Sequence, residues 1–291
     1  MPDTAWPRAI ARAAHNKSLV LFLGAGVSAN SRNDLGKTPP KWDDLLRSLA
    51  QAIYLDKYAA KEFERLINAR QLLDAAELLK FSANSTGRTA DLTRGLQEAV
   101  QGPRGHAFRS SPWHEVIAQI DPAIIITTNY DKILEAAPEF DYMVTTYASD
   151  DIDSHIRSNE PIILKIHGSI DEPSKTILTR SDYARLHREG ALALSVVRAL
   201  MTTRTFLFIG YSLSDPDLQA LLQDVFAARL NHNVSPHYIL TSNSSLEHQR
   251  EALKYCYGVS TITYDDTQHD YGLQMFQKLG AQVASTAPID F

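Results

Sequence analysis

The sequence of 291 residues contains a single cysteine, Cys256. One thiol forms neither an intrachain disulfide nor a thiolate-rich zinc site, so both are excluded within the chain. Cys256 lies in LKYCYG, between a helical run and an apolar run, where we expect it to act as a small buried apolar residue. We expect no metal site.

An excess of basic residues and a long apolar run are also missing. The formal net charge is −5, which gives no basic surface for direct binding of nucleic acid. No run approaches the ~18 apolar residues that span a bilayer, and the first residues carry Arg and His where a signal peptide has its apolar core. These features predict a cytoplasmic protein that contacts neither nucleic acid nor a membrane directly.

The composition is that of an ordinary globular protein, with 44% hydrophobic and 22% charged residues. Short β-rich runs alternate with longer helical runs, and most of the β-rich runs are nearly unbroken apolar stretches, as is typical of strands covered on both faces. The alternation predicts an α/β fold with a doubly wound, mainly parallel, six-stranded Rossmann-like sheet. The expected strands are 19–23, 124–127, 162–166, 206–209, 238–240 and 261–264, and the expected helices between them include 132–137, 191–201, 217–230 and 246–255.

The connection between the first two expected strands is far longer than a single crossover needs. It contains three amphipathic patterns, at 42–54, 61–81 and 92–100, and it is punctuated by SANSTG and QGPRG. We interpret it as a helical insertion at about 42–120 within a single domain that covers residues 1–291.

The first strand runs into the motif GAGVS, which contains Gly24, Ala25, Gly26 and Ser28. Glycines after a strand allow backbone N–H groups to approach a pyrophosphate closely, because no Cβ stands in the way. The spacing differs from GxGxxG, and we expect a polar loop rather than a helix to follow at once. A tight strand-to-loop turn is the alternative interpretation.

The second strand ends in TTNYD, which contains Thr128, Asn129 and Asp131. Open α/β sheets bind ligands at the carboxyl ends of their strands, so Asn129 is placed to hold a ribose hydroxyl or a water. Asp131 either contacts the ligand or caps the helix expected at 132–137.

The third strand ends in His167 and Gly168, at the equivalent position. A neutral imidazole is available as a general base near neutral pH, and Gly168 would permit close approach of a ligand. The other nine histidines, such as His15, His114 and His187, are expected at the surface.

The last two motifs are polar ends of later strands. Gly210 and Ser212 of GYS suit a phosphate or ribose contact, whereas Ser214 or Asp215 is expected to cap the next helix ahead of a proline. Ser242 and Asn243 follow the fifth strand. Convergence of several such ends on one edge is more specific than any single one.

In order and spacing, these motifs resemble those of the sirtuin family across residues 18–265. GAGVS resembles the GAGxS nucleotide loop, TTNYD the TQNxD segment, HG the pair with the catalytic histidine, GYS the GTS-type turn and, more loosely, TSN the later adenosine-ribose segment. Two departures stand out. The segment between HG and GYS lacks the four cysteines of the deacylases' zinc ribbon, and TPPKWDDLL replaces the PDFR-type segment.

These departures, together with the insertion, resemble the divergent sirtuin-like branch of bacterial antiphage systems, such as Thoeris, HerA-associated and short Argonaute systems. The resemblance implies hydrolysis of NAD+ to nicotinamide and ADP-ribose, without a metal, as the gated effector of abortive infection by NAD depletion. It assigns catalysis to Asn129 and His167. It assigns NAD binding to Gly24, Ala25, Gly26, Ser28, Thr128, Asp131, Gly210, Ser212, Ser242 and Asn243.

The same resemblance implies assembly. We expect a homo-oligomer and a separate activating subunit, either a HerA-type ATPase or an Argonaute-like protein. Two alternatives stay open: an NAD-dependent protein deacylase, and a non-catalytic subunit that senses NAD or ADP-ribose. A dehydrogenase is disfavoured, because no hydride-transfer site and no GxGxxG spacing is present.

Overall fold

The computed structural model describes residues 6–158, 160–211, 215–228, 237–244, 247–265 and 270–285. Seven strands form one parallel sheet in the order β3-β4-β2-β1-β5-β6-β7. The predicted doubly wound α/β fold is therefore confirmed, with seven strands in place of six. The strands are β1 (Leu19–Leu23), β2 (Ile124–Thr127), β3 (Met143–Thr146), β4 (Ile162–Lys165), β5 (Thr205–Ile209), β6 (His237–Ser242) and β7 (Val259–Tyr264).

The strand that the sequence analysis missed is β3, at one edge of the sheet. Met143 and Val144 are exposed, so the run lacks the unbroken apolar character of the central strands. The strand exists because it pairs in parallel with β4. A short half-polar edge strand carries little periodic signal of its own.

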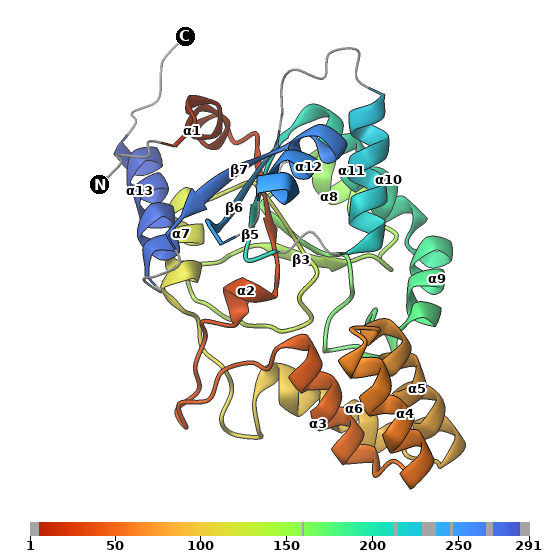
Figure 1. The fold of residues 1–291 in the computed structure, drawn as a ribbon. Helices are drawn as coiled ribbons and strands as arrows, with labels where there is room; N and C mark the ends of the chain where they lie inside the picture. The colour runs from red at the N-terminus through yellow and green to blue at the C-terminus, as the bar shows by residue number, and fades with distance from the viewer. Residues whose placement is uncertain are drawn as a thin grey trace.

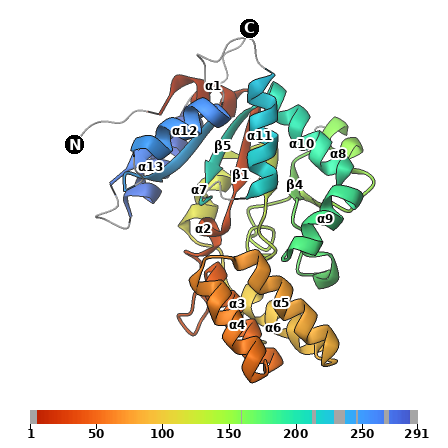
Figure 2. The same ribbon diagram turned by 45° about the vertical axis from the view of Figure 1, so that its right-hand side comes forward.

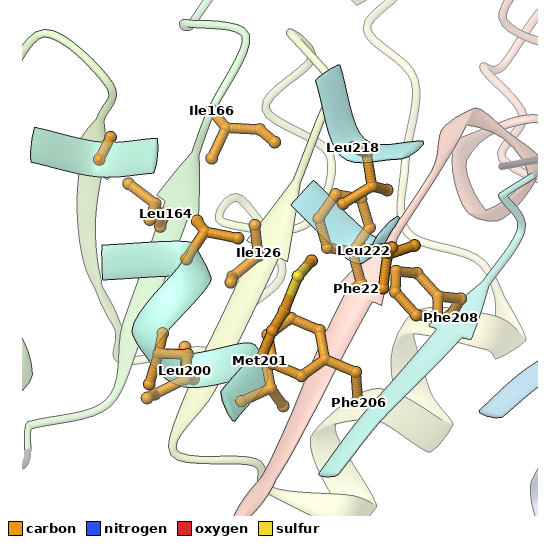
Figure 3. Close-up of a cluster of buried hydrophobic side chains, with 14 of the residues drawn as sticks. Phe22, Ile126, Leu164, Ile166, Leu200, Met201, Phe206, Phe208, Leu218 and Leu222 are labelled. Carbon is orange, nitrogen blue, oxygen red and sulfur yellow. The ribbon is translucent and has the colours of Figure 1, made fainter. Parts of the chain in front are cut away.

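The sheet is covered on both faces, because alternate side chains of each strand enter two separate cores. One core lies under α8 (Ile152–Ser158), α10 (Ala191–Thr203) and α11 (Pro216–Ala227). Figure 3 shows Phe22, Phe206 and Phe208 of the sheet packed against Met201 of α10 and Leu222 of α11.

The opposite core lies under α1 (Arg8–His15), α7 (Pro112–Ile120) and α13 (Tyr271–Ser285). Here α13 packs directly on α7, where Trp113 stacks on Phe276 with ring centroids 5.6 Å apart. Among the described residues, no helix is long and apolar enough to cross a membrane.

Four further helices form a bundle beyond the sheet, next to the short helix α2 (Ala25–Ser28), as Figures 1 and 2 show. Their apolar faces share a third core that is separate from the two at the sheet. We call these four helices the insertion bundle: α3 (Trp42–Ile53), α4 (Lys57–Asn68), α5 (Leu72–Ser85) and α6 (Thr89–Gln101).

Two helix predictions were wrong. The expected helix 61–81 is two helices, because the chain turns between α4 and α5 with Arg70 in the left-handed region at a φ of 58°. Both helices bury one face in the same core, so the apolar period continues across the break. Residues 132–137 form turns rather than a helix, since a buried contact network described below holds this segment.

The prediction for Cys256 was also wrong. It lies on α12 (Glu247–Tyr257), which packs against β7 and α11, and its side chain is exposed. None of the residues of α12 is buried, so this helix covers the sheet edge with a mostly solvated surface.

Candidate active site

The carboxyl ends of the strands meet along one edge of the sheet, and β1 lies between β2 and β5. The chain passes from β1 to β2 on one side and from β5 to β6 on the other. The loops after β1 and β5 therefore diverge at a topological switch point, where open α/β sheets bind their ligands.

At this switch point the two glycine loops are packed backbone to backbone. Gly26 N–H donates to the Gly210 carbonyl at 2.8 Å, and Gly24 N–H donates to the Ile209 carbonyl at 2.9 Å. A Cβ on Gly26 would lie 2.7 Å from the Gly210 Cα, and a Cβ on Gly210 would lie 2.5 Å from the Val27 nitrogen. The glycines are thus required for loop-to-loop contact. A helical turn, α2, opens directly after Gly24, contrary to the polar loop expected there.

The loop after β2 is joined to the loop after β1 through side chains. The Asn129 amide donates to Ser28 Oγ at 3.0 Å and to the Gly24 carbonyl at 3.2 Å. Ser28 Oγ in turn donates to Asp131 Oδ2 at 2.8 Å. The other oxygen of Asp131 accepts from the Ile133 backbone at 3.0 Å, so Asp131 caps a turn and no helix follows it.

A buried lysine supports this loop from below. Lys165, the last residue of β4, is 1% exposed and its ammonium contacts the Asp131 carbonyl and, at 2.6 Å, Glu135 Oε1. Burial raises the pKa of Glu135 above its usual range, although the charge of Lys165 and its hydrogen bond oppose the shift. The buried pair explains why residues 132–137 form turns, since Glu135 must reach back to the strand.

A small cavity lies beside Asn129. It has room for about one water molecule, and Ser28, Asn129, Asp131, Lys165 and His114 are among its lining residues. The prediction that His114 lies at the surface was wrong: it is buried on α7, and its ring nitrogen accepts from the Ser111 backbone at 3.0 Å. Burial lowers the pKa of His114, so the neutral ring is favoured there.

His167 is held from the other face of the sheet. The residue is 6% exposed, and its Nε2 lies 3.2 Å from Asp215 Oδ2. Tyr183 of α9 (Arg180–Glu189) donates to the same oxygen at 2.6 Å. Burial opposes ionisation of Asp215, but the adjacent imidazole of His167 and the hydrogen bonds from Tyr183 and the Leu218 backbone outweigh it and hold the pKa of Asp215 below its usual range.

Asn129 and His167 lie on neighbouring strand ends. Thr127 of β2 pairs with Lys165 of β4, and each candidate residue follows two positions later. The backbones of adjacent strands lie about 4.8 Å apart, so the two loops are side by side. The Asn129 amide is directed toward the loop after β1, whereas the imidazole is directed toward the start of α11.

The insertion bundle contacts both loops. Tyr130 and Ile170, which follow Asn129 and His167, belong to the core of the bundle. The start of α9 is also tied to α5, where Asp74 accepts from Arg180 at 2.9 Å and Lys80 pairs with Asp182 at 2.7 Å. The two candidate catalytic loops therefore rest on the bundle as well as on the sheet.

Comparison with known proteins agrees with this geometry. Residues 123–262, from the start of β2 into β7, match the family described as the SIR2-like domain. This segment of the chain is thus similar to the SIR2-like domain over just under half of the sequence.

Matches to individual relatives extend the similarity beyond residues 123–262 to most of the chain. The NAD(+) hydrolase ThsA of Enterococcus faecium is 26% identical over 87% of this chain and 47% of its own length, and that of Cytobacillus dafuensis is 27% identical over 74% and 39%. Defense-associated sirtuin 2 of Bacillus subtilis is 25% identical over 90% of this chain and 25% of its own. The chain thus spans less than half the length of these relatives.

The remaining predicted residues that the structure describes are distributed along the same edge of the sheet. Ala25 begins α2 and Thr128 follows β2. Ser242 ends β6, and the exposed Asn243 is bonded through its backbone to the Tyr264 carbonyl at 2.8 Å. Ser212 and Ser214 lie outside the described residues.

Gly168 serves the fold in a different way from the one expected. Its φ is +81°, and a Cβ there would lie 2.7 Å from the Lys175 carbonyl. The close neighbour in the structure is thus the chain's own backbone. Among the described residues, no three His, Cys, Asp or Glu side chains are grouped as a metal ion would require.

Three residues of this site escaped the sequence analysis in whole or in part. Asp215 was expected only to cap α11, and it does accept from Leu218 N–H at 2.9 Å, but it also pairs with His167. Tyr183 carried no signal in a single sequence, because a tyrosine on a helix is ordinary. Lys165 did carry one signal, because a lysine two residues before His167, inside an apolar run, indicates a buried charge.

Proposed function

We propose that this protein is an NAD+ hydrolase that releases nicotinamide and ADP-ribose. The observation that carries the proposal is the pairing of neighbouring strand ends that bear Asn129 and His167, next to the glycine loops at the switch point. The names of the ThsA relatives support the same activity.

The chemistry follows from the leaving group. Nicotinamide in NAD+ is cationic, so the C1′–N bond breaks with its electron pair going to nicotinamide, and the ribose becomes oxocarbenium-like. A water then forms the new C1′–O bond and gives up one proton. Asn129 orients this water or the ribose hydroxyls, and His167 accepts the proton directly or through those hydroxyls.

The binding roles divide along the edge. The loops with Gly24, Ala25, Gly26, Ser28 and Gly210 hold the pyrophosphate side, since they lie at the switch point. Thr128 and Asp131 lie on the nicotinamide-ribose side. Ser212, Ser242 and Asn243 complete the proposed binding set toward the adenosine side.

The test is to replace the two proposed catalytic side chains and separate the products by chromatography. Asn129→Ala and His167→Ala should each abolish nicotinamide release, while NAD+ still binds and the protein stays folded. His15→Ala is the matched control, because His15 ends α1 just before β1, at the opposite edge of the sheet. Retained turnover in both Asn129→Ala and His167→Ala would refute the assignment.

The same assay distinguishes NAD+ hydrolysis from the alternative enzymatic function, NAD-dependent protein deacylation. An acetyl-lysine peptide would yield O-acetyl-ADP-ribose if the domain were a deacylase, whereas free ADP-ribose is expected here. Stable NAD+ binding without nicotinamide release would instead indicate a sensor subunit.

We further propose that the activity serves antiphage defence by depleting cytoplasmic NAD+, as the name of the Bacillus subtilis relative suggests. Such an activity requires gating, and we propose that the protein works as a homo-oligomer with a separate activating subunit, such as a HerA-type ATPase or an Argonaute-like protein. Incubation with NAD+, with and without the product of the neighbouring gene, tests this. Full activity of the purified monomer would contradict it.

A further inference from the structure

Among the residues that the structure describes, Asp215 is the charged group paired with the imidazole of His167, and its own surroundings fix its orientation. Its Oδ1 accepts from the Leu218 backbone at 2.9 Å, at the start of α11. Its Oδ2 accepts from the Tyr183 hydroxyl at 2.6 Å and lies 3.2 Å from His167 Nε2. At 9% exposure the carboxylate therefore has both oxygens engaged by named donors.

This arrangement decides which ring nitrogen carries the proton. An ionised carboxylate only accepts hydrogen bonds, so the nitrogen that faces it must be a donor. In a neutral imidazole the other nitrogen is then the acceptor. With Nε2 facing Asp215, the basic nitrogen of His167 is Nδ1.

We propose that Asp215, held by Tyr183, is a positioning residue that fixes His167 in the Nε2–H tautomer and thereby makes Nδ1 the base of the reaction. The proposal rests on the NAD+ hydrolase function proposed above for the part that concerns turnover. The proton released by the attacking water or by the ribose hydroxyl goes to Nδ1. Asp215 stabilises the resulting imidazolium and stays ionised throughout.

Asp215→Asn separates this role from helix capping. The asparagine carbonyl can still accept from Leu218 N–H, so the start of α11 is preserved. The amide nitrogen then takes the place of Oδ2 and donates to Nε2, which must become an acceptor. The variant should therefore invert the tautomer of His167 to Nδ1–H and leave no base where one is needed.

The first measurement is nitrogen NMR of the protein labelled at histidine, without NAD+. His167→Gln identifies the His167 signals by their disappearance. We expect the Nε2–H tautomer in the wild-type protein and the Nδ1–H tautomer in Asp215→Asn. A wild-type Nδ1–H tautomer, or an unchanged tautomer in the variant, would overturn the proposal.

The second measurement is steady-state nicotinamide release. In Asp215→Asn we expect kcat to fall by about 10⁴-fold, the loss known for exchanging the carboxylate partner of a catalytic histidine for an amide that inverts its tautomer, with KM nearly unchanged. Tyr183→Phe should give a smaller fall in kcat, because the contact between Asp215 and His167 remains. A loss confined to KM, or an unchanged kcat, would contradict the role in turnover.

Asp56→Asn is the matched control. Asp56 caps α4 by accepting from the backbones of Tyr58 and Ala59, far from the sheet edge, so it tests the effect of the same substitution at a helix start. It should leave both the tautomer and kcat unchanged. If the wild-type protein releases no nicotinamide even with the product of the neighbouring gene present, while His167 shows the expected tautomer and its inversion, the hydrolase function fails and the positioning role stands.

Discussion

The loops at the carboxyl edge of the sheet are held together in two different ways. Around the switch point, the loops after β1 and β5 meet through backbone atoms, with Gly26 and Gly210 in van der Waals contact and no space for a Cβ. On the other side, the loops after β2 and β4 are held by buried side chains, in the pairs Lys165–Glu135 and His167–Asp215. We call these the glycine half and the charged half.

This difference determines which substitutions each half of the edge can accommodate. In the glycine half the contact is between main chains, so any added atom must move backbone. In the charged half each contact depends on a charge and its partner, so an isosteric exchange changes chemistry without changing shape. The glycine half thus fixes the shape of the edge, and the charged half fixes the protonation states of the side chains that lie there.

The largest effect is expected from breaking the buried pair of the charged half. Lys165→Met leaves Glu135 without its partner, and removing one member of a buried ion pair costs about 3–5 kcal/mol in the free energy of unfolding. Because burial raises the pKa of Glu135, protonation of this side chain at low pH stabilises the folded protein. That stabilisation is lost as the pH rises through the raised pKa. The destabilisation should therefore be smaller at pH 5 than at pH 8, as measured by urea unfolding.

Two controls define this result. Lys17→Met breaks the exposed pair of Lys17 with Asp121 and should cost less than about 1 kcal/mol. The double variant Lys165→Met, Glu135→Leu should recover most of the loss. If the double variant is as unstable as Lys165→Met, unpaired burial of Glu135 is not the cause.

The next effect comes from crowding the glycine half. Gly210→Ala places a Cβ 2.5 Å from the Val27 nitrogen, and the residue has a φ of +62°. We expect about 1–2 kcal/mol from the left-handed conformation and about 1–3 kcal/mol from crowding, together with weaker NAD+ binding by calorimetry.

Gly36→Ala separates the two contributions. Gly36 has a φ of +72°, but nothing lies within 4 Å of its Cβ position, so only the conformational part remains. Equal losses of stability in Gly36→Ala and Gly210→Ala would show that the contact with the loop after β1 adds nothing.

The two halves also differ in how far the sequence predicted them. Glycine motifs after apolar strands are local signals, and the strands β1, β2, β4 and β5 were predicted to within one residue at either end. The positions of Asn129 and His167 at neighbouring strand ends followed from the same pattern. Local periodicity is sufficient wherever a strand is buried on both faces.

The charged half was predicted only in part, because its contacts join residues distant in the chain. Tyr183 and Asp215 approach His167 from α9 and α11, and Glu135 reaches Lys165 across 30 positions. The failed helix at 132–137 has the same origin, since the tertiary pair with Lys165 overrides the local helical preference. His114 and Cys256 were assigned by residue type, and their exposure depends on which helix covers the sheet.

Ser28 is the side chain that joins the two halves, and its removal should have the smallest effect. Ser28 follows Gly26 in the glycine half, and its hydroxyl accepts a hydrogen bond from Asn129 and donates one to Asp131. Ser28→Ala removes both contacts, but Asn129 still donates to the Gly24 carbonyl at 3.2 Å. We expect a loss of about 1 kcal/mol in the free energy of unfolding and about a fivefold lower rate of nicotinamide release, because Asn129 becomes less well oriented.

Ser31→Ala is the matched control, because the Ser31 hydroxyl is fully buried and has no hydrogen-bond partner among the described residues, so its removal should change neither quantity. If Ser28→Ala matches Ser31→Ala in both stability and turnover, the two halves act independently and the hydroxyl bridge does not orient Asn129.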